Sequence, residues 1–199
     1  MTTIYFDFET GGVLPEHPNI QLAAIAVDDA TGGELAAFEQ KIQFDPKQCA
    51  TEALALNGWQ EEAWKDALPV PAVAAKFDSF LAPHKCVRMV SKRTGSPYNV
   101  AKGAGYNALT FDWPRLKALF GTRFLPMSYR VRDVLQRAVF YFDEHPDLRC
   151  PDDYKLSTIC EYFGIKTEGA HDALVDVRLT AALYWKLKES PLTTSAAVP

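Results

Sequence analysis

The sequence lacks several features that would place it in common classes of protein. Its four cysteines form no C-x-x-C pair, which argues against a structural zinc site and fits free thiols in a reducing compartment. It contains no run of about 18 apolar residues, so we expect no membrane-spanning helix and no membrane partner. The N-terminus carries neither a basic segment nor a long apolar segment, so we expect no secretory signal. These absences together predict a cytoplasmic protein.

An overall excess of positive charge is also missing. The net charge is −4 over 199 residues, and 48% of the residues are hydrophobic, which is ordinary for one substantial globular domain. Ten of the 21 basic residues nevertheless lie between Ser79 and Arg132, where Asp112 is the sole acid. An acidic protein can bind a polyanion if its basic residues gather on one face. The alternative is that residues clustered along the chain are not clustered in space.

The pattern of apolar residues predicts an α/β domain with a mixed sheet. Segments 3–9, 20–28 and 34–44 are expected to form an antiparallel meander of strands. Segment 91–105 is expected to be a mobile loop, and 105–108 to re-enter the sheet. We expect one domain over residues 1–189 and a flexible tail over 190–199. The expected helices span 51–57, 59–67, 72–81, 113–120, 135–144, 156–163 and 173–188.

Two acidic residues end the first apolar segment. Alternation along a strand places Asp7 and Glu9 on one face, roughly 7 Å apart at about 3.3 Å per residue. Charges beside a core are costly without a partner, and hard oxygen ligands suit magnesium or manganese. A metal site is one interpretation of this pair. The alternative is a solvated turn that leads into Gly11 and Gly12.

A third acid, Asp112, stands two residues before Pro114. Proline is favoured in the first helical turn, so Asp112 is expected at or beside the start of a helix. The simplest interpretation is a helix N-cap, a role that aspartate performs well. Its position in a basic window favours a carboxylate that binds a metal or a water beside bound phosphates.

The start of the last expected helix carries His171, Asp172 and Asp176. Asp172 is the expected N-cap, and Asp176 should point partly inward because it neighbours the apolar stripe at Val177. A spacing of five residues does not put His171 and Asp176 on one helical face, so His171 is expected in the preceding loop, above the site. Histidine is a suitable general base for a water molecule. The alternative for His171 is a plain surface histidine.

These residues form an ordered set that resembles a known family. The chain is similar to the DEDD-type 3′–5′ exonucleases, in the subgroup whose last motif is His-x-x-x-x-Asp. That subgroup includes the polymerase proofreading subunit, ribonuclease T and the three-prime repair exonucleases. The resemblance covers residues 4–187, with motifs at 7–12, at 107–112, and at 155–165 together with 170–176. Tyr106-Asn107 stands where many members have His-Asn, and the step from Asn107 to Asp112 is one residue longer, which leaves substrate preference open.

The resemblance implies a fold and a chemistry. The fold would be ribonuclease-H-like, with a mixed five-stranded sheet whose first three strands are antiparallel and with helices on both faces. Two Mg²⁺ or Mn²⁺ ions would be held around the scissile phosphate by Asp7, Glu9, Asp112 and Asp176. His171 would take the proton from the attacking water, and the product would be a nucleoside 5′-monophosphate.

The glycine turn after the first strand would contact the substrate. Thr10 and the backbone of Gly11 and Gly12 would hold the terminal nucleotide, and Val13 or Leu14 would wedge against its base. An ordinary glycine turn is the alternative for this segment.

Aromatic and basic residues provide further candidate contacts. Tyr98 and Tyr106 are candidates for base stacking, which tolerates any sequence, although such aromatic residues more often belong to a core. We expect a core position for Trp113. The remaining candidate substrate contacts are Asn107, Lys92 and Arg93.

The preferred function is that of a metal-dependent 3′–5′ exonuclease acting on single-stranded DNA ends. An exoribonuclease that trims RNA ends is the alternative among enzymes, because the choice depends on how the pocket treats a 2′-OH. A binding module with an inactive nuclease fold would lack a metal ligand or a base, and none is missing from the sequence. A structural protein that binds calcium incidentally would not need the basic window. A homodimer and a polymerase or repair partner both stay open.

Overall fold

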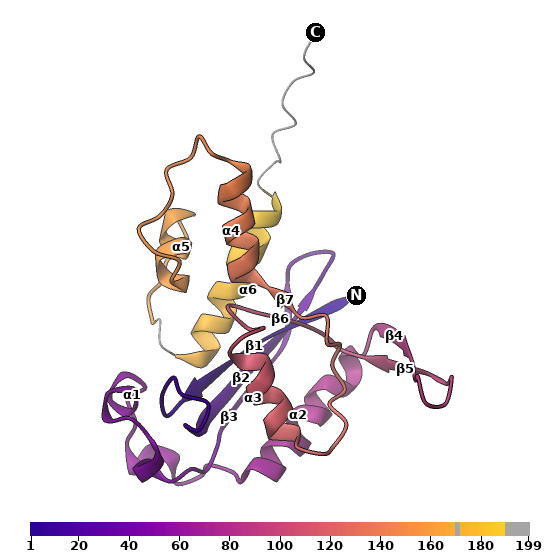
Figure 1. The fold of residues 1–199 in the computed structure, drawn as a ribbon. Coiled ribbons are helices and arrows are strands. Elements are labelled where there is room, and N and C mark those ends of the chain that lie inside the picture. The colour runs from indigo at the N-terminus through magenta and orange to yellow at the C-terminus, as the bar shows by residue number, and fades with distance from the viewer. Residues whose placement is uncertain (170–171, 190–199) are drawn as a thin grey trace.

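A mixed five-stranded sheet lies between two layers of helices in the computed structural model, which describes residues 1–169 and 172–189 (Figure 1). The strand order is β3-β2-β1-β6-β7. The first three strands are antiparallel, whereas β6 runs parallel to β1 and β7 parallel to β6. This arrangement confirms the predicted fold class. The strands of this sheet are β1 Thr2–Thr10, β2 Asn19–Asp28, β3 Glu34–Lys41, β6 Lys102–Gly105 and β7 Arg132–Asp133.

The helices divide between the two faces of the sheet. One core lies between the sheet and α2 and α3, and the other between the sheet and α4, α5 and α6. None of the described helices is long and apolar enough to cross a membrane. The helices are α1 Thr51–Leu56, α2 Val70–Leu81, α3 Asp112–Phe120, α4 Val134–Glu144, α5 Leu156–Tyr162 and α6 Ala173–Glu189.

The central strand β1 supplies both cores, because its side chains alternate between the two faces. Ile4, Phe6 and Phe8 are buried in the core of α2 and α3. Tyr5 is buried on the other face, in the core that contains α6. The alternation predicted from the sequence is therefore confirmed, and it turns the odd-numbered positions of β1 toward α6.

The prediction of a mobile loop over 91–105 is wrong. Part of this segment belongs to a two-stranded antiparallel hairpin, β4 Val87–Val90 and β5 Pro97–Val100, and its end is β6. The predicted re-entry at 105–108 is therefore displaced, because the strand already ends at Gly105. The segment 59–67 is also not an α-helix, and only its part Glu61–Trp64 forms a 3-10 turn. These elements are too short for the periodicity of their apolar residues to be visible.

Gly105 ends β6 where the chain turns toward α3. A Cβ atom on Gly105 would lie 2.8 Å from the carbonyl oxygen of Phe6 and 2.8 Å from Cβ of Ala108. Neither neighbour is the flexible end of a side chain. We expect Gly105→Ala to lower the free energy of unfolding by about 2 kcal/mol, measured by urea denaturation. Gly33→Ala is the matched control, because its Cβ would meet only the Thr31 hydroxyl at 3.3 Å; equal effects of the two substitutions would contradict the prediction.

Candidate active site

Asp7 and Glu9 stand on β1, on the face that α6 covers. Asp7 lies opposite Ala23 of β2 and Glu9 lies opposite Gln21, and Ala23 belongs to the α6 core. Both acidic side chains are half-buried, at the end of the strand that leads into the 11–19 loop. The strand thus holds two carboxylates at the edge of a core rather than in a solvated turn.

Asp112 approaches these carboxylates from α3. It is 1% exposed, and its Oδ1 accepts a hydrogen bond from the backbone N–H of Phe8 at 3.1 Å. The N-cap residue of α3 is Phe111, which makes no side-chain cap, so the N-cap interpretation of Asp112 is wrong. The Asp112 carboxylate instead ties the start of α3 to β1, between the two acids of that strand.

Asp176 approaches from the first turn of α6, a helix that packs against β1 and β2. Asp172 begins the helix as predicted, because its Oδ1 accepts hydrogen bonds from the N–H groups of Leu174 at 3.0 Å and Val175 at 3.1 Å. The Asp176 side chain is half-buried. His171 lies outside the described residues, so its role as general base stays a prediction.

Burial and mutual repulsion raise the pKa of both acids on β1. Burial raises the pKa of Asp7 to about 7, helped by the charge of Asp176 and opposed by the N–H of Phe8. Burial also raises the pKa of Glu9 to about 8, with smaller effects from Asp7, Asp176 and Asp172. Shifts of this kind, in carboxylates that face one another, are typical of functional sites.

The pKa of Asp112 is also raised well above its ordinary value. Burial is the main cause and the charge of Asp7 the second, while the Phe8 N–H and the Arg115 guanidinium act in the opposite direction. The acids of β1, α3 and α6 therefore interact electrostatically, although they come from distant parts of the sequence.

The 11–19 loop continues directly from β1. The Thr10 hydroxyl donates to the carbonyl of Gly12 at 2.9 Å, and the Asn57 side-chain amide donates to the carbonyl of Thr10 at 2.9 Å. Gly12 has φ 150°. Val13 and Leu14 are 81% and 49% exposed. The segment is thus a tightly bonded glycine turn, and it presents two apolar side chains to solvent beyond the carboxylates.

Arg115 holds this loop against α3. Its guanidinium is buried and donates to the carbonyls of His17 at 3.0 Å and Leu14 at 3.1 Å, and to the side-chain oxygen of Asn19 at 3.1 Å. The sequence indicated Arg115 only as one of the basic residues between Ser79 and Arg132. Its position one helical turn after Asp112 was the available signal that it faces the same region.

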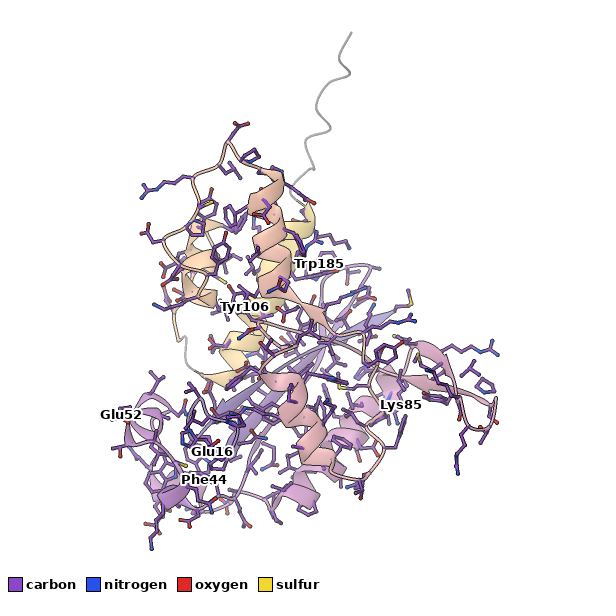
Figure 2. All side chains as sticks on the ribbon, viewed as in Figure 1. Glu16, Phe44, Glu52, Lys85, Tyr106 and Trp185 are labelled. Atoms are coloured by element: carbon purple, nitrogen blue, oxygen red, sulfur yellow. The ribbon has the colours of Figure 1, made fainter. Side chains whose placement is uncertain are left out.

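Two other candidates lie in the connection between β6 and α3. Tyr106 donates its hydroxyl to the carbonyl of Tyr154 at 2.5 Å and packs against the α6 core; Figure 2 shows it near the centre of the molecule. Asn107 is exposed, with φ 54°, and its Oδ1 accepts from the Thr110 hydroxyl at 2.5 Å. Trp113 packs against the core of α2 and α3, as predicted.

The structure does not bring Tyr98, Lys92 and Arg93 to the carboxylates. They belong to the β4–β5 hairpin, which enters β6 beside the amino end of β1, whereas the acids stand toward its carboxyl end. Figure 2 shows Lys85, at the base of this hairpin, well apart from Glu16, in the 11–19 loop. The basic residues of segment 79–132 therefore lie in separate places and do not gather around the carboxylates.

The chemistry of the four carboxylates suits a hard divalent cation, because oxygen ligands are what magnesium and manganese prefer. Burial raises the pKa values of Asp7, Glu9 and Asp112, and the repulsion between neighbouring acids raises them further; a cation would relieve that repulsion. In the part of the chain that the structure describes, however, no three His, Cys, Asp or Glu side chains are already arranged to hold a metal ion. The carboxylate oxygens therefore suit a divalent cation in type and in charge, but they do not form a complete coordination sphere.

Comparisons with known proteins identify the fold. No protein-family model and no curated protein matches the sequence. Solved structures do match: E. coli exonuclease I with a dT13 oligonucleotide has 21% identity and a TM-score of 0.70, over 95% of this chain and 41% of that chain. The zinc-bound form of an E. coli exonuclease I complex with single-stranded DNA has 23% identity and a TM-score of 0.71, over 96% and 41%. A product-bound structure of exonuclease I has 20% identity and a TM-score of 0.70, over 94% and 43%.

The described chain spans about two fifths of the length of these exonuclease I structures. At these identities the likeness establishes architecture. The chain therefore has the fold of E. coli exonuclease I, a mixed five-stranded sheet with helices on both faces.

Proposed function

We propose that this chain is a metal-dependent 3′–5′ exonuclease that releases nucleoside 5′-monophosphates from single-stranded DNA ends. The observation that carries the proposal is the convergence of acids from β1, α3 and α6, with Asp112 bonded to the backbone of β1 between Asp7 and Glu9. The fold supports it, since the similar exonuclease I structures include complexes with single-stranded DNA.

The chain's own residues have distinct tasks in this proposal. Asp7, Glu9, Asp112 and Asp176 would hold two Mg²⁺ or Mn²⁺ ions, which when bound would supply an activated water and charge stabilisation at the scissile phosphate. His171 would accept the proton of the attacking water.

The 11–19 loop would position the last nucleotide. Thr10, Gly11 and Gly12 follow the carboxylates directly along the chain, and exposed Val13 and Leu14 offer an apolar surface for a base. Arg115 would keep the loop in this position through its bonds to the loop carbonyls. The loop would thereby exclude water from the base while the phosphate stays at the acids.

Release of nucleotides from labelled oligomers tests the proposal. With Mg²⁺, a 5′-labelled single-stranded DNA should shorten as a ladder, and a 3′-labelled one should release labelled mononucleotide at once. EDTA and Asp176→Asn should both abolish the release, whereas Asp147→Asn, an exposed acid in the α4–α5 connection, should leave it intact. The rate of release from an RNA of the same sequence shows whether the protein prefers ribose or deoxyribose. A folded protein that releases no nucleotide from either strand would overturn the proposal.

A further inference from the structure

The β4–β5 hairpin is a separate two-stranded sheet that projects from the domain (Figure 1). Its inner face carries Met89 and Tyr98, which are paired across the strands. The Tyr98 ring contacts Phe124 edge to face, with centroids 5.7 Å apart. The outer face carries exposed Arg88, opposite Asn99. Packing therefore covers one side of the hairpin and leaves the other side and the turn in solvent.

The segment after α3 runs beside the base of the hairpin. Ala101 donates its N–H to the carbonyl of Pro126 at 2.8 Å, and its own carbonyl accepts from the N–H of Ser128 at 2.8 Å. This pairing brings Arg123 and Phe124 next to the hairpin. Phe124 is 64% exposed in spite of its contact with Tyr98. We call Lys92, Arg93, Arg123 and Phe124 the hairpin surface; all four are exposed.

The positive charge of the hairpin surface is not neutralised. Within residues 1–169 and 172–189, no carboxylate lies within 4.0 Å of a basic group of this surface. Other basic residues of the same window have partners: Lys85 pairs with Asp78, and Lys102 with Asp29. Among the described residues, the fold thus leaves the cations of the hairpin turn and of the segment after α3 without an acidic partner, and that segment also carries the exposed Phe124 ring.

An exposed ring and unpaired cations on one hairpin and its neighbouring segment supply the two kinds of contact that bind single-stranded nucleic acid. Lys and Arg neutralise phosphates, and aromatic rings stack on bases of any sequence. An acidic peptide would use the charges but would not need the ring, so a nucleic acid strand fits the whole surface better.

The hairpin surface is remote from the carboxylates. Cys86, just before β4, donates its thiol to the carbonyl of Thr2 at 3.3 Å, at the first residue of β1. Glu9 is seven residues further along, which is about 23 Å at about 3.3 Å per residue. At about 3.4 Å per stacked nucleotide, that span corresponds to roughly seven nucleotides. A very short oligomer with its 3′ end at the acids cannot reach the hairpin.

We infer that the hairpin surface binds the upstream part of the DNA strand whose 3′ end lies at the carboxylates. This inference rests on the proposed function and adds a second contact to it. The enzyme consequently favours strands long enough to span both places, and Lys92 and Arg93 contact substrate upstream rather than at the cleavage site.

Two oligonucleotides of different length test the inference. The triple variant Lys92→Ala/Arg93→Ala/Arg123→Ala should bind an oligo-dT of about 20 nucleotides about tenfold more weakly than the unmodified chain, by fluorescence anisotropy in EDTA. The slope of log K against log salt should become shallower by about 2, for three lost phosphate contacts at about 0.7 each. With Mg²⁺, kcat/KM should fall about tenfold on this oligomer and stay unchanged on an oligo-dT of about four nucleotides, which is too short to reach the hairpin.

A second variant separates the ring from the charges. Phe124→Ala should weaken binding of the long oligomer about tenfold with the salt slope unchanged, and Phe124→Tyr should restore it, because stacking needs an aromatic face. The charge-matched control is Arg149→Ala/Lys186→Ala/Lys188→Ala, three exposed cations on other elements. It should behave like the unmodified chain.

The outcomes separate this inference from the proposed function. If the unmodified chain cleaves DNA while the triple variant binds and cleaves the long oligomer equally well, the upstream contact is refuted and the exonuclease stands. If the unmodified chain binds the long oligomer without turnover, the exonuclease is refuted, and the anisotropy of the triple variant still decides whether the hairpin surface binds DNA. An equal loss on both lengths, or in the charge-matched control, also refutes the upstream contact.

Discussion

Asp7→Asn should abolish mononucleotide release and, in EDTA at pH 8, raise the melting temperature of the protein. Asp7 is the acid of β1 whose pKa is raised to about 7 by burial and by the charge of Asp176. Asparagine has nearly the same shape without the charge, so it removes a metal ligand and a repulsion together. We expect the rate to fall on the order of 10³-fold and the melting temperature to rise by about 5 °C.

The dependence of this effect on pH follows from the direction of the pKa shifts. Asp7 has an ordinary value of 3.8 and is raised to about 7 in the fold, and Glu9 goes from 4.5 to about 8. A raised acid contributes stability below its unfolded value and loses it as the pH rises through its folded value. Metal-free protein should therefore lose stability between about pH 4 and pH 8. The gain from Asp7→Asn should be larger at pH 8 than at pH 5.

Differential scanning calorimetry with and without Mg²⁺ checks this prediction. Mg²⁺ should raise the melting temperature of the unmodified chain at pH 8 and have little effect on Asp7→Asn, because binding to the folded state alone stabilises it. Asp147→Asn serves as the control for loss of an acid at an exposed position. An Asp7→Asn protein that melts earlier than the unmodified chain in EDTA at pH 8 would contradict the account of repulsion.

Arg115→Ala should destabilise the protein and loosen the 11–19 loop. The guanidinium bonds three acceptors of the loop and β2, His17 O, Leu14 O and Asn19 Oδ1, and its removal leaves them without this donor. We expect a loss of about 3 kcal/mol in the free energy of unfolding. For a chain of this size that is a fall of about 9 °C in the melting temperature.

The loop should show the change more strongly than the rest of the protein. Cleavage by a protease at residues 13–16 should become faster in Arg115→Ala, and KM for single-stranded DNA should rise because the loop positions the last nucleotide. Lys117→Ala is the control, an exposed cation on the same helix. Arg115→Lys should be intermediate, since an ammonium cannot reproduce the planar fork of donors. Unchanged proteolysis in Arg115→Ala would show that other contacts hold the loop.

The parts of the fold that could be predicted are those with a strong local pattern. In β1, Ile4, Phe6 and Phe8 alternate with Tyr5 and two acids, and this pattern predicts both the strand and its two faces. The last helix has an apolar stripe over several turns, so its type and limits were also clear.

The parts that could not be predicted depend on contacts between distant residues. In β6, Lys102–Gly105 consists of four residues with two glycines, and it is a strand because its neighbours in the sheet bury it. Asp112 does not cap α3 as the local sequence suggested, because its carboxylate accepts a hydrogen bond from the N–H of Phe8, 104 residues away. Nothing in the local sequence distinguishes these outcomes.

In the candidate site, too, some residues could be predicted from the sequence and others could not. The acids could be chosen from their order and spacing along the chain, because that order resembles a family. The outer contacts could not be predicted. Tyr98, Lys92 and Arg93 share a basic window with Arg115, yet their hairpin lies beside the amino end of β1, whereas Arg115 is bonded to the loop that follows its carboxyl end. Arg115 is bonded to the backbone of a loop about 100 residues earlier, a partner that spacing alone cannot reveal.

The order of the acids along the chain also decides when the site is complete during synthesis. Asp7 leaves the ribosome 169 residues before Asp176 of α6. At about 5–20 residues per second this interval is roughly ten to thirty seconds. A nascent chain can pair β1 with β2 and β3 in that time, but it does not yet carry all four carboxylates. The proposed site therefore stays incomplete until α6 has emerged and docked on the sheet.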